Sequence, residues 1–170
     1  RYTQPNDWHR QAAHAIISPP EGEVRTEREY WEGRSKAAEM AQEKGWRGFS
    51  VIPHPYRVTE EGKARYRAED PEYGIWVWLR NDVEGMSRYT YWSPHYHIVG
   101  ATGAGMEPAK DSDEWVYHFR RSVESFDGVR DGESHEDLYG LFRYLLSHTG
   151  YPAESTKQTV TWYGDLANSV

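Results

Sequence analysis

Short apolar or alternating runs mark a series of strands along the chain. The run from Ala12 to Ser18 is apolar and is closed by two prolines, which predicts a buried strand. Pro53 and Pro55 are expected to bend or end the next strand, because proline cannot donate to a strand ladder. The remaining predicted strands cover residues 48–58, 74–79, 88–100 and 114–123, with an alternating tail at 158–163.

A first helix is predicted from about residue 26 to residue 44. Thr26 and Glu29 have the spacing of a capping box, and Gly45 is a natural stop. Its apolar stripe would consist of Tyr30, Trp31, Ala37, Ala38, Met40 and Ala41.

A second helix is predicted near the end of the chain, with Ser134 as its N-cap and Gly150 as its stop. Its apolar stripe would consist of Leu138, Leu141, Phe142 and Leu145, bordered by Leu146.

The order of these elements predicts an α+β fold, with a central antiparallel sheet covered by helices. Residues 59–73 are charged and are predicted to form an exposed loop. The glycines of residues 100–105 lack the Lys-Ser/Thr of a phosphate loop and predict a plain turn. The length of 170 residues suits one domain, and Arg at position 1 suggests a domain of a longer protein.

The amino-acid composition limits the metal ligands and the class of protein that the chain can represent. The absence of cysteine excludes disulfides and thiolate metal ligands, so a metal ion would need imidazole or oxygen ligands. Aromatic residues make up 15% of the chain and can supply a core despite its polarity. No apolar run approaches the roughly 20 residues needed to span a bilayer, and nothing resembles a signal peptide, so a cytoplasmic protein is expected.

The most informative motif is His95-Tyr96-His97. In a strand, His95 and His97 project from one face while Tyr96 points to the other. Two imidazoles about 6–7 Å apart along a strand can converge on one divalent cation. The alternative is coincidence, because the chain has eight histidines and buried histidines are often only packed.

The second helix carries a further pair. Tyr144 and His148 lie one turn apart on one flank of its apolar stripe, and Tyr139 and Arg143 pair similarly on the opposite flank. The two tyrosines cannot both face one site, because they are five positions apart and their side chains therefore point about 140° apart around the helix axis. Alternatively, Tyr144 is a boundary residue and His148 is favoured only by the helix dipole.

Together these features resemble the HUH endonucleases, and most closely the rolling-circle replication initiators of haloarchaeal plasmids and viruses. The resemblance runs from about Ala12 to Gly150 and is carried by the strings HAIISPP (14–20), SPHYHIVG (93–100) and YLLSH (144–148). It implies a ferredoxin-like or RRM-like core. It also implies nicking and rejoining of single-stranded DNA through a covalent 5′-phosphotyrosine, which starts rolling-circle replication.

The resemblance also implies roles for particular residues. Tyr144 would be the nucleophile, with Tyr139 as the second choice, because many initiators have Lys four residues after the tyrosine and Arg143 follows Tyr139 at that spacing. His95, His97 and His148 would hold a divalent metal ion, Mn²⁺ or Mg²⁺. Three imidazoles would also suit Zn²⁺, Co²⁺ or Ni²⁺.

The implied partner is single-stranded or hairpin origin DNA, with replication proteins such as a helicase, and no membrane. The net charge of −7 argues against a broadly basic surface, so DNA binding would need a local cluster of arginines or aromatic stacking. The candidate arginines are Arg120, Arg121, Arg130 and Arg143, and the candidate stacking platforms are Trp76, Trp78, Trp92 and Trp115, most of which are expected in the core.

Four alternatives remain open. The chain could be a catalytically inactive DNA-binding domain of the same fold, or a transposase of the same superfamily. It could be an unrelated metal enzyme, although the further Glu and His motifs of a cupin are absent. It could also be a structural domain whose histidines are only packed.

Overall fold

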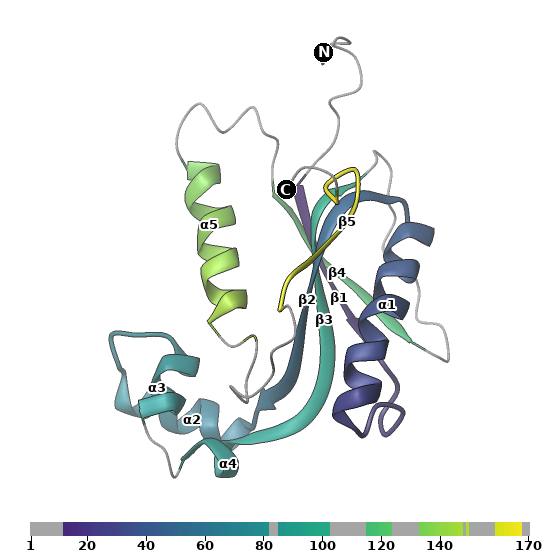
Figure 1. The fold of residues 1–170 in the computed structure, drawn as a ribbon. Helices are drawn as coiled ribbons and strands as arrows, with labels where there is room; N and C mark the ends of the chain where they lie inside the picture. Colours follow the sequence, from purple (N-terminus) through teal and green to yellow (C-terminus); the bar gives the residue numbers. More distant parts are fainter. Residues whose placement is uncertain are drawn as a thin grey trace.

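A five-stranded antiparallel sheet forms the centre of the molecule (Figure 1). The computed structural model describes residues 12–81, 85–102, 115–123, 133–147, 149 and 159–167. The strand order is β4-β1-β3-β2-β5, and every pairing is antiparallel. The strands are β1 (Ala12–Ser18), β2 (Trp46–Val58), β3 (Thr90–Thr102), β4 (Val116–Val123) and β5 (Thr161–Gly164). Helices pack on this sheet, so the predicted α+β class is confirmed.

One face of the sheet is covered by α1 (Glu27–Glu43). Its start follows the predicted capping box, because the Thr26 side chain accepts from the Glu29 amide and the Glu29 carboxylate accepts from the Thr26 amide. Gly45 has a φ of +89°, a conformation that glycine adopts without strain. The helix buries its small and aromatic residues against alternate residues of β1, β2 and β3. This face therefore forms the main hydrophobic core.

The opposite face is covered by α5 (Glu133–Leu146), which begins one residue before the predicted N-cap, Ser134, and ends before the predicted stop at Gly150. Leu145 is fully buried and packs against Ile52 of β2 and Val99 of β3. This second core is small, so part of the face is left to polar side chains.

Three helices lie between β2 and β3 along the chain, where the sequence predicts a loop and a strand. The predicted loop at 59–73 contains α2 (Glu60–Glu69), whose first turn is capped by the Thr59 side chain. The predicted strand at 74–79 is wrong, because this segment belongs to α3 (Ile75–Asn81), and α4 (Gly85–Tyr89) follows it.

A satellite core explains this difference. Trp76, Trp78 and Leu79 are buried together with Val58 and Tyr89. This packing stabilises the segment as a helix, although its composition favours a strand. We call the segment from α2 to α4 the helical insert. Among the described helices, none is long and apolar enough to cross a membrane.

Of the two effects predicted for the prolines of β2, bending or ending the strand, the ending is wrong. The strand continues through Pro53 and Pro55 to Val58, but its register against β3 shifts between His54 and Tyr56. A proline at position 55 has no N–H to donate to the ladder, which accounts for an irregularity there. Such irregularities redirect nearby side chains, and this one lies beside the candidate site.

Candidate metal centre

Strand β3 presents two imidazoles on the face covered by α5. His95 and His97 are 7% and 5% exposed. Tyr96, between them, points to the opposite face, where it packs in the main core and donates a hydrogen bond to the Tyr30 carbonyl at 2.7 Å. Burial raises the pKa of Tyr96, so this phenol remains protonated at neutral pH. The tyrosine thereby anchors the strand segment that carries both histidines.

A third imidazole comes from β2. His54 is paired with His95 across the two strands and is fully buried. Its ring centroid lies 5.3 Å from that of His95 and 4.3 Å from that of His97, while the His95 and His97 centroids are 5.1 Å apart. One nitrogen from each ring lies within 4.8 Å of the others, so the three residues could hold a metal ion.

Hydrogen bonds fix which nitrogen of two of these rings carries a proton. Nε2 of His54 lies 2.9 Å from the Leu145 carbonyl oxygen, and Nδ1 of His95 lies 2.8 Å from the Ser93 carbonyl oxygen. A carbonyl oxygen only accepts, so both nitrogens are donors. In a neutral imidazole the other nitrogen then carries the lone pair that a metal ion binds. These are Nδ1 of His54 and Nε2 of His95.

The third ring is engaged by a fourth histidine. Nδ1 of His97 lies 2.7 Å from Nε2 of His14 on β1, and the two rings are nearly parallel, with an interplanar angle of 14° and centroids 5.0 Å apart, so they meet edge to edge. If His97 donates in this contact, its Nε2 carries the lone pair. An imidazole held through its second nitrogen is the usual arrangement around a protein metal ion. The pattern around His54, His95 and His97 therefore fits a metal centre better than casual packing does.

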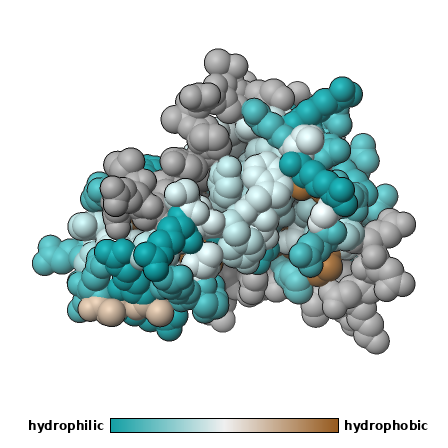
Figure 2. Space-filling model, turned by 90° about the horizontal axis from the view of Figure 1, so that it is seen from below, coloured by the Kyte–Doolittle hydropathy of each residue, from teal (hydrophilic) through white to brown (hydrophobic). Residues whose placement is uncertain are grey.

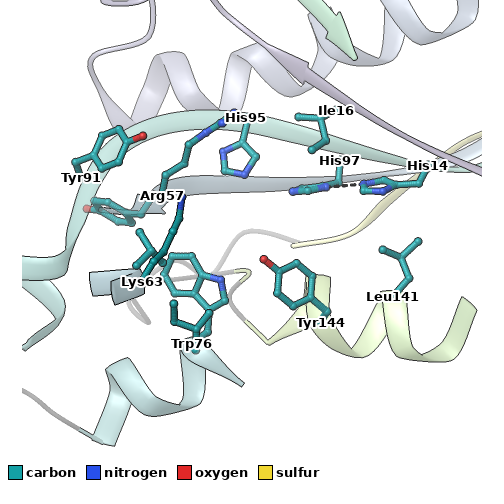
Figure 3. Close-up of a pocket in the computed structure, with 13 residues that line it drawn as sticks. His14, Ile16, Arg57, Lys63, Trp76, Tyr91, His95, His97, Leu141 and Tyr144 are labelled. Atoms are coloured by element: carbon teal, nitrogen blue, oxygen red, sulfur yellow. Dashed lines mark hydrogen bonds between the residues drawn. The ribbon is translucent and has the colours of Figure 1, made fainter. Parts of the chain in front are cut away.

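Two of the three clustered histidines, His95 and His97, line a cavity of about 470 Å³ that Tyr144 also lines, whereas the fully buried His54 does not line it. His14, His95 and His97 form one wall, and Tyr144 lies on α5 opposite them with its hydroxyl directed into the cavity (Figure 3). Tyr144 is 52% exposed, so a ligand can reach it. A centre with three protein ligands and an open side is typical of catalytic rather than closed structural metal sites.

Two contacts hold the end of α5 at this wall. The His54 ring donates to the Leu145 carbonyl, one residue beyond Tyr144. Arg80 of the helical insert donates to the Ser147 carbonyl. The last turn of α5, and with it Tyr144, is therefore attached both to the sheet and to the insert.

The other predicted site residues are placed differently. His148, the predicted third metal ligand, and the side chain of Tyr139 lie outside the described residues. Arg143 is exposed on α5 but does not line the cavity. The side chains of Arg120, Arg121 and Arg130 also lie outside the described residues.

Three of the four tryptophans considered as stacking platforms are buried. Trp115 lies in the main core, and Trp76 and Trp78 lie in the satellite core. Trp92 is 36% exposed, and its Nε1 donates to the Val24 carbonyl.

Sequence reasoning missed His54 and His14. Each lies in an apolar strand segment, and a histidine in such a segment is a signal of a buried, partnered imidazole. Strand pairing was needed to bring them to His95 and His97, because 41 residues separate His54 from His95 and 83 separate His14 from His97.

Comparisons with protein-family models, with curated proteins and with solved structures find no match for this chain.

Proposed function

We propose that this protein nicks and rejoins single-stranded DNA through a covalent bond between Tyr144 and a 5′-phosphate. The observation that carries the proposal is that two of the three clustered imidazoles, those of His95 and His97, line one cavity together with the Tyr144 side chain, whose hydroxyl is directed into it. Tyrosine and histidine at such a site suit phosphoryl transfer, in which an oxygen nucleophile attacks a phosphorus atom whose charge must be stabilised.

His54, His95 and His97 would hold the metal ion. When bound, it would polarise the phosphate oxygens and stabilise the charge that develops on them. Imidazole donors favour Mn²⁺, Co²⁺, Ni²⁺ or Zn²⁺ over Mg²⁺, which prefers oxygen ligands. We therefore expect better activity with Mn²⁺ than with Mg²⁺.

In the reaction, the Tyr144 oxygen forms a bond to phosphorus as the bond from phosphorus to the 3′ oxygen breaks. The phenol loses a proton and the leaving 3′ oxygen gains one, so the step is balanced. The products are a phosphotyrosine carrying the downstream strand and a free 3′ hydroxyl. The phosphotyrosine retains the energy for rejoining, and the 3′ hydroxyl could prime replication of a plasmid or virus.

The test is a search for the covalent adduct. A pool of single-stranded oligonucleotides of random sequence, labelled at the 3′ end, is incubated with the protein and Mn²⁺ and analysed by denaturing electrophoresis. The 3′ label is required because the protein retains the strand downstream of the cut. We expect a labelled protein band that disappears with chelator and in Tyr144→Phe.

Controls separate the alternatives. The band should survive Tyr139→Phe and His118→Gln, which changes an exposed histidine of β4 outside the cluster. Loss of the band in Tyr139→Phe together with its survival in Tyr144→Phe would move the nucleophile to Tyr139. DNA binding without any adduct would instead favour a catalytically inactive binding domain.

A further inference from the structure

The side of the cavity nearest the helical insert carries residues that the proposed cleavage step does not use. Arg57 from β2, Lys63 from α2 and Tyr91 from β3 line it beside His95, and Trp76 from α3 closes it (Figure 3). Tyr144 enters from α5, on another side. The reacting tyrosine and the two cations thus approach the histidines from different directions.

Arg57 has a hydrogen-bond donor that no described residue accepts from. Its Nη2 donates to Ser18 Oγ at 3.2 Å, and its Nε is buried without a hydrogen-bond partner among the residues that the structure describes. Within the described part of the chain, Arg57 forms no ion pair. A partly buried guanidinium in this state is suited to an anion, above all a phosphate.

Lys63 supplies a second cation at the rim of the same space. Its ammonium group lies 2.6 Å from a Glu60 carboxylate oxygen, and the two side chains are 45% and 83% exposed. An exposed pair at this spacing contributes little and exchanges easily. The lysine can therefore turn to a bound phosphate.

Tyr91 joins this space to a neighbouring one. It is 49% exposed and lines both the histidine cavity and a second cavity of about 580 Å³, which also includes Arg25 and Trp92. Viewed from below, the described surface at this end is mostly hydrophilic around a central area of nearly neutral hydropathy (Figure 2). This surface suits a polar chain with flat bases better than a lipid or an apolar protein face.

We infer that Arg57, Lys63 and Tyr91 form a subsite for the nucleotide next to the scissile phosphate. The two cations bind its phosphate, its base stacks on Tyr91, and the strand continues over Tyr91 towards the second cavity. This inference rests on the proposed function, because it takes the strand to cross the histidine centre. It also explains how a chain of net charge −7 can bind a polyanion through local rather than overall charge.

The test is the salt dependence of binding, measured without cleavage. Fluorescence anisotropy follows a labelled pool of random 15-nucleotide single strands bound to the full chain in chelator, at a series of salt concentrations. Each lost phosphate contact should reduce the slope of log K against log salt by about 0.7. We expect this reduction in Arg57→Gln and in Lys63→Gln. In Tyr91→Leu the affinity should fall about 5- to 150-fold with an unchanged slope.

Arg28→Gln is the matched control, because Arg28 is an exposed arginine on α1, on the other face of the sheet. Lys63→Gln keeps the test decisive if Arg57→Gln does not fold, since Lys63 lies on the surface. Three results would overturn the subsite. They are unchanged slopes in Arg57→Gln and Lys63→Gln, an equal loss of slope in Arg28→Gln, and no DNA binding by the parent chain. A missing covalent adduct with the expected slopes would overturn the cleavage proposal and leave Arg57, Lys63 and Tyr91 as a binding site for single-stranded DNA without a scissile phosphate.

Discussion

Replacement of His54 tests the metal centre, because the side chain has two separable roles. It donates to the Leu145 carbonyl on α5, and its other nitrogen faces His95 and His97. His54→Leu removes both roles, whereas His54→Gln keeps an N–H that can reach the carbonyl but removes the imidazole. The two variants therefore separate the hydrogen bond from the metal ligand.

The expected magnitudes follow from the two roles. Without metal, His54→Leu leaves a buried carbonyl without its donor, at a cost of about 1–3 kcal/mol. In a domain of 150–250 residues each kcal/mol shifts Tm by about 2–4 °C. With Mn²⁺ at a hundred times Kd, the parent chain should gain about 2.7 kcal/mol, or roughly 5–11 °C. A hundredfold loss of affinity would reduce this gain to about 0.4 kcal/mol.

The assay is thermal unfolding of the parent chain, both His54 variants and His118→Gln, each in chelator and in Mn²⁺. We expect the Mn²⁺ shift in the parent and in His118→Gln, and its near loss in both His54 variants. A full shift in His54→Gln, or none in the parent chain, would refute the assignment of His54 as a ligand.

Three further predictions concern the anchoring of the site and the core. His14→Phe should weaken Mn²⁺ binding about 10- to 100-fold. His14→Gln should weaken it less, because the amide oxygen of Gln can still accept a hydrogen bond from His97. Equal Mn²⁺ affinities of the two variants, measured by calorimetry, would contradict this. Gly33→Ala should cost about 1–3 kcal/mol, since its Cβ would overlap the Tyr96 hydroxyl. Adding Tyr96→Phe should recover part of this loss in denaturant unfolding, and strict additivity would contradict it. Above pH 10, stability should fall by about 1.4 kcal/mol per pH unit for each of Tyr30 and Tyr96, whose pKa burial raises most, because the unfolded chain then binds fewer protons than the folded one. Burial also raises the pKa of Tyr117, which should add to the fall. A flat alkaline stability profile would contradict the last prediction.

Local signals in the sequence predicted local structure well. The capping box at Thr26 and the apolar strand at Ala12–Ser18 depend on neighbouring residues, and the structure has both. The α3 segment was mispredicted because its tryptophans and valine favour a strand in isolation, whereas the satellite core with Val58 and Tyr89 fixes it as a helix.

In the candidate site, too, the sequence predicts what depends on neighbouring residues but not what depends on strand pairing. The spacing of His95 and His97 places both on one face of any strand, so this part was readable from the sequence. His54 and His14 join them only through the pairing of β2 and β1 with β3, which sequence spacing does not reveal. The sequence therefore identified the motif but not its full set of partners.

The most direct measurement is anomalous diffraction from crystals of the protein soaked with Mn²⁺. We expect a single strong peak within bonding distance of Nδ1 of His54 and of Nε2 of His95 and His97. A peak bonded to other residues, or none at a Mn²⁺ concentration that saturates binding in solution, would contradict it.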